Sequence, residues 1–401
     1  MTITSQAFFQ RIKKTIPGLL FVTYGLFTIG YFLSPDYNNH YRFFAKAVFF
    51  PALFVLLEPF REIMKHPVLR LTLVYLIYML ASSLWSDTFS LFEFGQRLTI
   101  SVYILVFITT TRYLNDRYET GFDRMLKFAV LVAAIAAIVS IVVWYRNHAF
   151  PGSRAEGLGS LTNVNEFANV YGVFALLATG YLLRASTLRE KGVYILAIVA
   201  FLCFIWFGQS RTAFSVLFFT LILLSFCMAG QGRIKTIAWL VACVVALALI
   251  FPEQIENAWL RGVGLRLPIW KGVIAEIAEA PLLGHGVLTK LHIFVPGYDF
   301  QVAHNAYLHV LWQGGAVGLG LFVLLMATAF RQAWLLGKER GQFVIFSVLV
   351  FTAGIMLTGV DDVIVRPREQ WMVFWFPLAL LISRQTINAR GSRLQGSSRT
   401  S

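Results

Sequence analysis

Long apolar runs recur along this chain from one end to the other, and they constrain its fold more than any single motif. A run of about 17 or more apolar residues is long enough to cross the hydrocarbon core of a bilayer as a helix. Helices of this kind satisfy their own backbone groups where no water is present. The predicted spans cover residues 16–34, 41–57, 67–85, 91–110, 125–145, 165–183, 192–207, 212–229, 234–251, 310–330, 342–359 and 371–386.

The composition supports a membrane protein. Hydrophobic residues make up 58% of the chain and charged residues only 13%, whereas a soluble domain has roughly 45–50% apolar and 25% charged residues. We therefore predict an all-α polytopic membrane protein with about 12 transmembrane helices. Residues 1–251 would carry helices 1–9, residues 252–303 one large loop, and residues 304–401 helices 10–12 and a tail.

The net charge of +14 is unevenly distributed over the predicted loops. With a cytoplasmic N-terminus, 22 of the 34 Lys and Arg residues fall in cytoplasmic segments, as the positive-inside rule requires. We therefore predict that both termini are cytoplasmic and that the large loop lies outside. Topology explains most of the charge, so no nucleic-acid partner is required.

No motif for a cofactor or a metal is present in the sequence. Cys203, Cys227 and Cys243 lie inside apolar stretches without a CxxC pair, which favours neither a disulfide framework nor a zinc site. The phosphate-loop pattern GxxxxGK[ST] and the zinc motif HExxH do not occur either. We expect no cofactor and no metal.

The loop of residues 252–303 is long enough to suggest a function of its own. Apolar residues recur in it at helical spacing from Ile269 to Ile277, and Pro268 suits a first helical turn. We predict a helix over residues 268–280, ended by a turn at Pro281-Leu-Leu-Gly284-His-Gly286. Its apolar face could lie on the membrane surface or against a small core within the loop, and the sequence leaves both open.

Cations at the predicted outer helix ends are not explained by the topology rule. An arginine near hydrocarbon is costly unless it is paired, and guanidinium groups bind phosphate through two parallel hydrogen bonds. A lipid-linked phosphate or pyrophosphate would fit such a cluster. Pairing with Asp36, Asp87, Glu93, Asp361 or Asp362 is the simpler interpretation for any single arginine. These cations are Arg42, Lys46, Arg97, Arg146, Arg154, Arg211, Arg261, Arg266, Lys271, Arg366 and Arg368.

Three of the outer polar residues have a setting that favours chemistry. Arg211 lies in the tight turn Gly208-Gln-Ser-Arg-Thr212 between two spans, and Arg266 precedes the predicted loop helix, whose N-terminus attracts anions. His304 is predicted at the start of a helix in which Gly314-x-x-x-Gly318 admits a close neighbour. Imidazole is a competent general base near neutral pH, although a helix-capping role is the alternative for His304.

These motifs, in this order around one large loop, resemble the O-antigen ligase and polymerase superfamily, and the ligases in particular. The resemblance rests on Gly208-Gln-Ser-Arg211-Thr, on Arg266-Leu-Pro-Ile-Trp270 with Pro281-Leu-Leu-Gly284-His-Gly286, and on His304-Asn-Ala-Tyr307. It implies a glycosyltransferase C-type fold in the bacterial inner membrane, with the large loop and the active site in the periplasm.

The resemblance also implies a reaction. The donor would be a glycan on undecaprenyl pyrophosphate, the acceptor lipid A–core oligosaccharide, and the transfer inverting and independent of metal. Arg211 and Arg266 would bind the pyrophosphate and His304 would be the catalytic base. We further expect Asn305, Tyr307, Arg154 and Arg261 to contact substrate.

Two other functions are weighed against this one. An O-antigen polymerase would use a second lipid-linked repeat unit as acceptor, but the chain length and the His304-Asn pattern favour a ligase. A lipid-linked glycan flippase or transporter would show polar residues at mid-membrane and internal repeats, whereas polarity here gathers at the outer rim. Asp361-Asp362 could hold a metal-bound diphosphate, but a salt-bridged turn beside Arg366 and Arg368 is the simpler interpretation.

Overall fold

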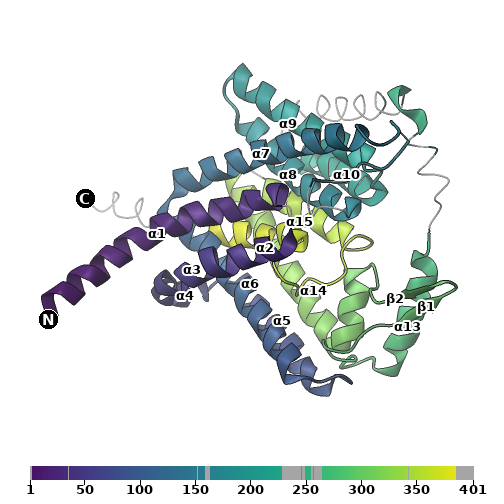
Figure 1. The fold of residues 1–401 in the computed structure, drawn as a ribbon, viewed down its shortest axis with the longest axis horizontal. Coiled ribbons are helices and arrows are strands. Elements are labelled where there is room, and N and C mark those ends of the chain that lie inside the picture. The colour runs from purple at the N-terminus through teal and green to yellow at the C-terminus, as the bar shows by residue number, and fades with distance from the viewer. Residues whose placement is uncertain are drawn as a thin grey trace.

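The structure is a computed structural model of the whole chain, and it is helical throughout its bundle (Figure 1). Seven helices are long and apolar enough to cross a membrane, and three shorter apolar helices accompany them in the described part of the chain. The polytopic helical class is thus confirmed, whereas the count of twelve and the glycosyltransferase C-type fold stay predictions. The described residues are 2–34, 36–150, 152–158, 163–227, 245, 249–253, 256, 264–341 and 343–384.

Most predicted spans coincide with a helix or lie within one. The helices are α1 (Thr2–Leu33), α2 (Tyr37–Phe43), η1 (Phe44–Phe49), α3 (Phe50–Val55), α4 (Leu57–Ile63), α5 (Pro67–Ala81), η2 (Ser82–Trp85), α6 (Leu91–Arg117), α7 (Glu119–Tyr145), α8 (Val164–Arg184), α9 (Leu188–Phe207), α10 (Arg211–Cys227), α13 (Arg266–Glu279), α14 (Ala306–Arg340), α15 (Val344–Ile355) and η3 (Trp371–Trp375). The predicted span 41–57 is divided among α2, η1 and α3 because Pro51 has no N–H to donate and the helix widens before it. The predicted span 234–251 lies largely outside the described residues.

Helix α8 is the centre of the bundle. It packs against α7, α9, α10 and α15, and 83% of its most apolar window is buried, as expected of a helix that is hydrophobic all round. On the peripheral helix α7, by contrast, Ile135, Ile138 and Val142 are exposed. Exposed apolar faces of this kind fit contact with lipid.

The large loop contains α13 and a short antiparallel hairpin, which lie together beside α14 at one side of the molecule (Figure 1). The hairpin pairs β1 (Ile293–Val295) with β2 (Tyr298–Phe300), and strands of three residues are too short for the sequence to have predicted them. The helix predicted at 268–280 is confirmed as α13. Its buried residues Ile269 and Val273 join Ile293 of the loop and Trp312 of α14 in a separate core. Because Leu267 and Ile274 of the same helix stay exposed, contact with the membrane surface remains a prediction beside this core.

The turn that follows α13 packs against a break in helix α14. Gly315 has non-helical angles (φ 60°, ψ −165°) inside α14. The backbone groups around this break bond to the loop: His285 N–H donates to Trp312 O (2.9 Å), and Ala316 N–H donates to Pro281 O (2.9 Å). A side chain on Gly284 would meet the backbone at Gly315, and the reverse also holds, so both positions require glycine.

The close approach predicted at Gly314 and Gly318 is confirmed. A Cβ atom at Gly314 would lie 2.9 Å from Met79 Sδ, and one at Gly318 would lie 3.1 Å from Tyr78 Cε1. Both neighbours belong to α5, and the Tyr78 hydroxyl donates to Gly314 O at 2.7 Å.

We call the end of the bundle that carries α13 the loop end.

Candidate functional site

Arg211 follows a turn that a neighbouring segment fixes in place. Between α9 and α10, Gln209 adopts a positive φ of 50°. Residues 152–158 lie along this turn: Ala155 N–H donates to Phe207 O (3.0 Å), and Gln209 Nε2 donates to Gly152 O (3.2 Å). Arg211 is thus the first residue of α10, exposed at a defined position.

Arg154 also helps to fix the turn before Arg211. Its Nε donates to Gly208 O and its terminal nitrogen to Asn165 Oδ1, both at 3.0 Å. The guanidinium therefore joins the turn before Arg211 to the first residues of α8. The sequence predicts that Arg154 contacts substrate, but the structure gives it partners in the protein that position the turn. Arg261, the other predicted substrate contact among the arginines, lies outside the described residues.

His304 is held from both sides in a strained backbone conformation. Its φ is +48°, and Gln209 is the other non-glycine residue with a positive φ in the described part of the chain. Such conformations cost free energy and concentrate at functional sites. Ala303 O accepts a hydrogen bond from Trp270 Nε1 (3.0 Å), and Ala306 N–H donates to Met356 O (2.9 Å). The helix itself begins at Ala306, so the prediction that His304 opens it was wrong.

Asn305 and Tyr307 have structural partners. The Asn305 side chain caps α14, accepting from Tyr307 N–H and Leu308 N–H at 3.0 Å each, which explains where the helix starts. The Tyr307 hydroxyl donates to Ala353 O in α15 at 3.0 Å. The predicted contact of Asn305 and Tyr307 with substrate stays a prediction.

Asp361 faces the imidazole of His304. Its Oδ1 lies 3.3 Å from His304 Nδ1, and this buried oxygen makes no hydrogen bond within the described part of the chain. The next residue, Asp362, fixes the loop, because its Oδ2 accepts from Arg97 at 2.8 Å. Asp362 thus forms a salt bridge, but its partner is Arg97 and not Arg366 or Arg368, the arginines beside which the sequence predicted a salt-bridged turn. The contact between Asp361 and His304 has no signal in the sequence.

Arg266, in the first turn of α13, is the fourth residue of the candidate site, after Arg211, His304 and Asp361. Burial lowers the pKa of Arg266, the nearby Arg211 guanidinium lowers it further, and the Asp361 carboxylate opposes both effects. Arg211 and Asp361 therefore both lie within electrostatic reach of Arg266. Four segments far apart in the sequence bring together two guanidiniums, a carboxylate and an imidazole. Arg211 and Arg266 are thus linked to His304 through Asp361, and their roles toward a substrate stay predictions.

An open apolar groove runs past Arg211. It has a volume of about 560 Å³ including its mouth, and its apolar lining comes from Ile205, Trp206 and Phe214. The groove has one guanidinium at its side and otherwise mostly apolar walls. Such a groove suits an amphiphile whose charged group lies at Arg211 and whose chain follows the helices.

A second charged cluster, which the sequence does not predict, lies near the candidate site. Arg368 approaches Glu369 Oε1 at 3.1 Å and Glu166 Oε2 at 3.7 Å, and its guanidinium lies 4.7 Å from the centre of the Tyr37 ring. Glu369 is only 1% exposed. This cluster links the first turn of α8 to the segment that follows Asp361, and so steadies both.

The fold and the site define a polytopic helical membrane protein with a cationic site, built around an imidazole, at the loop end of its bundle. No protein-family model matches the chain. A curated protein of Pseudomonas aeruginosa named O-antigen ligase is 30% identical over 373 residues, which cover 91% of this chain and 88% of that protein. This chain therefore belongs to the O-antigen ligase family.

Proposed function

We propose that this protein transfers an O-antigen glycan from undecaprenyl pyrophosphate to lipid A–core oligosaccharide at the periplasmic side of the bacterial inner membrane. The transfer is inverting and uses no metal. Membership of the O-antigen ligase family supports the ligation, and the excess of basic residues in the predicted cytoplasmic segments supports the orientation. The candidate site supports the mechanism.

The two arginines are suited to bind the donor pyrophosphate. Arg211 and Arg266 repel each other, and Arg266 is partly buried, so an anion between them relieves both the repulsion and the loss of hydration. Guanidinium groups match phosphate oxygens in geometry, and the N-terminus of α13 adds its dipole beside Arg266. The polyprenyl chain would leave along the apolar groove next to Arg211.

His304 is suited to take the proton of the acceptor hydroxyl. The Asp361 carboxylate, 3.3 Å from Nδ1, favours the tautomer with the proton on Nδ1, which leaves a lone pair on Nε2. The acceptor oxygen forms its bond to the anomeric carbon while the bond from that carbon to the pyrophosphate oxygen breaks. The proton goes to Nε2 and the electron pair to the pyrophosphate, whose new charge Arg211 and Arg266 stabilise. Attack opposite the leaving group inverts the anomeric configuration.

One observation carries this proposal: an imidazole that faces a carboxylate at 3.3 Å, near two guanidiniums. The test is reconstitution of the purified protein in lipid vesicles with a pyrophosphate-linked glycan and lipid A–core. We expect the mass of the acceptor to increase by that of the glycan. Elongated donor with unchanged acceptor would indicate a polymerase, and movement of intact donor between leaflets without any transfer would indicate a flippase.

A further inference from the structure

A second arginine-lined space lies at the opposite end of the bundle. Helix α8 carries Asn165 and Glu166 near the candidate site and ends at Arg184 in this space. Its 21 residues span about 30 Å, the thickness of the hydrocarbon core. The two sites therefore belong to opposite faces of the membrane. We call the second space the far recess.

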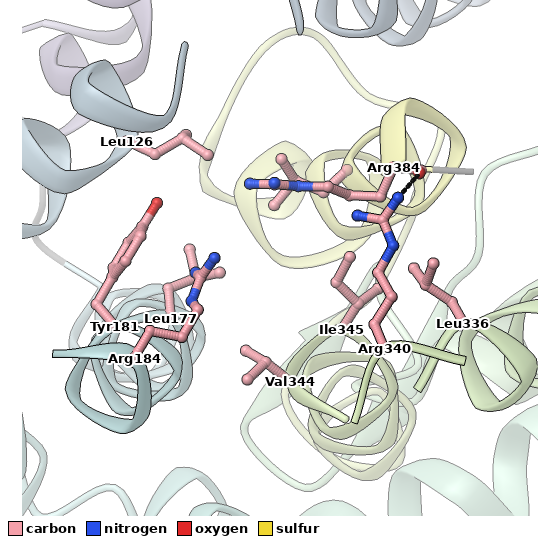
Figure 2. A pocket seen from close by; sticks show the side chains of 10 residues that line it. Leu126, Leu177, Tyr181, Arg184, Leu336, Arg340, Val344, Ile345 and Arg384 are labelled. Atoms are coloured by element: carbon pink, nitrogen blue, oxygen red, sulfur yellow. Dashed lines mark hydrogen bonds between the residues drawn. The ribbon is translucent and has the colours of Figure 1, made fainter. Parts of the chain in front are cut away.

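The far recess combines apolar walls with a cationic rim. Its cavity volume is about 50 Å³, and about 570 Å³ when the open solvent at its mouth is included, so a ligand would lie mostly at the mouth. Figure 2 shows Arg184, Arg340 and Arg384 around it, beside apolar side chains that include Leu336 and Ile345. The three arginines come from the end of α8, the end of α14 and the segment after η3. No carboxylate lies among the described residues that line the recess.

Backbone carbonyls and an aromatic ring help to orient two of these arginines. Arg184 Nε donates to Gly180 O (3.1 Å), and its guanidinium lies 4.9 Å from the centre of the Tyr181 ring. Arg340 donates to Arg384 O at 3.2 Å. Backbone carbonyls and an aromatic ring orient a guanidinium but carry no full negative charge.

Carboxylates near the recess only partly balance its charge. Asp123 lies 3.5 Å from Arg384 and 3.1 Å from Lys127, so one acid serves two cations. Glu119 and Glu339 act on Arg340 from outside the recess. The three arginines, with Lys127 nearby, thus outnumber these three acids. The positive-inside rule explains why cations lie at this face, and their convergence on one recess between helices suits an anionic headgroup.

We propose that the far recess binds the phosphate headgroup of an anionic glycerophospholipid. A basic pocket between membrane helices on the cytoplasmic side is suited to such headgroups, and the predicted orientation places the recess on that side. Free phosphate would share the guanidinium chemistry but would leave the apolar walls unused. The walls at Leu336 and Ile345 accommodate the first carbons of the acyl chains. This site is independent of the glycan transfer.

The test compares lipid binding by the full chain and by a triple variant, R184Q/R340Q/R384Q. Each protein is purified in detergent and titrated with phosphatidylglycerol, phosphatidylcholine or inorganic phosphate, and bound lipid is counted by native mass spectrometry. We expect the wild type to prefer phosphatidylglycerol, and the triple variant to bind it about a hundredfold more weakly. The matched control R124Q/R189Q/R331Q removes three exposed arginines outside the recess and should bind as the wild type does.

The outcomes separate the possible ligands. Equal loss of lipid in the recess variant and in the control would overturn the proposal, because the effect would then follow net charge alone. Binding of inorganic phosphate with the same affinity as phosphatidylglycerol would also overturn it, since the walls would then play no part. Should the triple variant fail to fold, R184Q alone is expected to weaken binding about fivefold, and unchanged binding in R184Q would contradict the proposal.

Discussion

The two arginine sites of this molecule lie at opposite ends of α8 and are built differently. At the loop end, Arg211 and His304 lie beside or within turns with positive φ angles, and each turn is bonded to a distant segment. At the far recess, Arg184 and Arg340 are the last residues of α8 and α14. Strained and externally fixed backbone marks the first site, and ordinary helix ends mark the second.

The sites also differ in what accompanies the arginines. The loop-end site includes an imidazole faced by Asp361, and imidazole is the side chain most often used as a general acid or base. The lining of the far recess offers guanidiniums, a tyrosine and apolar side chains. A cluster of arginines alone therefore indicates a site that binds an anion. Arginines beside an imidazole at a fixed position indicate a catalytic site.

The largest expected effect comes from removing the proton acceptor at the loop end. We expect His304→Ala to lower the transfer rate about a thousandfold, since a general base contributes roughly 10²–10⁴. Acceptor mass in the reconstituted assay measures the loss. His148→Ala, at an exposed histidine beyond α7, serves as control and should retain full transfer. Normal transfer by the His304 variant would remove the basis for distinguishing the two sites by their chemistry.

The next largest loss of activity is expected when an arginine of the candidate site is replaced by lysine. Arg266→Lys keeps the charge but loses the paired hydrogen bonds to phosphate, so we expect kcat/KM for the donor to fall about a hundredfold. Arg211→Lys should behave similarly. Arg146→Lys, an exposed arginine of the same predicted face, should change kcat/KM less than twofold. Equal losses at Arg146 and Arg266 would mean that net charge matters and position does not.

A smaller loss should follow from Asp361→Asn. Without the carboxylate the imidazole loses the partner that fixes its tautomer, and we expect kcat to fall about tenfold to a hundredfold with the KM for donor nearly unchanged. Asp362→Asn makes the informative comparison, because Asp362 is paired with Arg97. That variant should lower Tm, whereas Asp361→Asn should leave Tm close to that of the wild type. The reverse pattern would assign Asp361 a merely structural role.

The sequence predicted what depends on local patterns. Apolar runs gave most of the spans, and the spacing from Pro268 onward gave α13. The position of α13 in the fold depends on its tertiary contacts with residues such as Ile293 and Trp312, and local sequence patterns do not predict such contacts. The proximity of His304 to Asp361, 57 positions apart, is likewise a consequence of tertiary packing. One error was avoidable, because asparagine is a preferred helix cap and Asn305 could have placed the helix start after His304.

A modest effect is expected from the link between α13 and the His304 segment. Trp270→Phe removes the hydrogen bond to Ala303 O, worth about 1 kcal/mol, so we expect kcat to fall about fivefold through misplacement of His304. Trp312→Phe is the matched control: it lies in the same small core, but its indole N–H has no hydrogen-bond partner in the described structure. Equal effects on kcat in the two variants would indicate loss of packing rather than loss of position.

The smallest expected change in transfer rate is the one caused by metal removal. This measurement tests whether the arginines alone neutralise the leaving pyrophosphate. If Arg211 and Arg266 neutralise the departing pyrophosphate, then a chelator such as EDTA should leave the transfer rate within about twofold of the untreated enzyme. The same chelator is then applied to the Arg266→Lys variant. Should added Mg²⁺ restore that variant to the wild-type rate, the metal would be able to replace a guanidinium at the pyrophosphate. A strict requirement for a divalent cation in the wild type would instead mean that the arginines only bind the donor, and the loop-end site would then resemble the far recess in its chemistry.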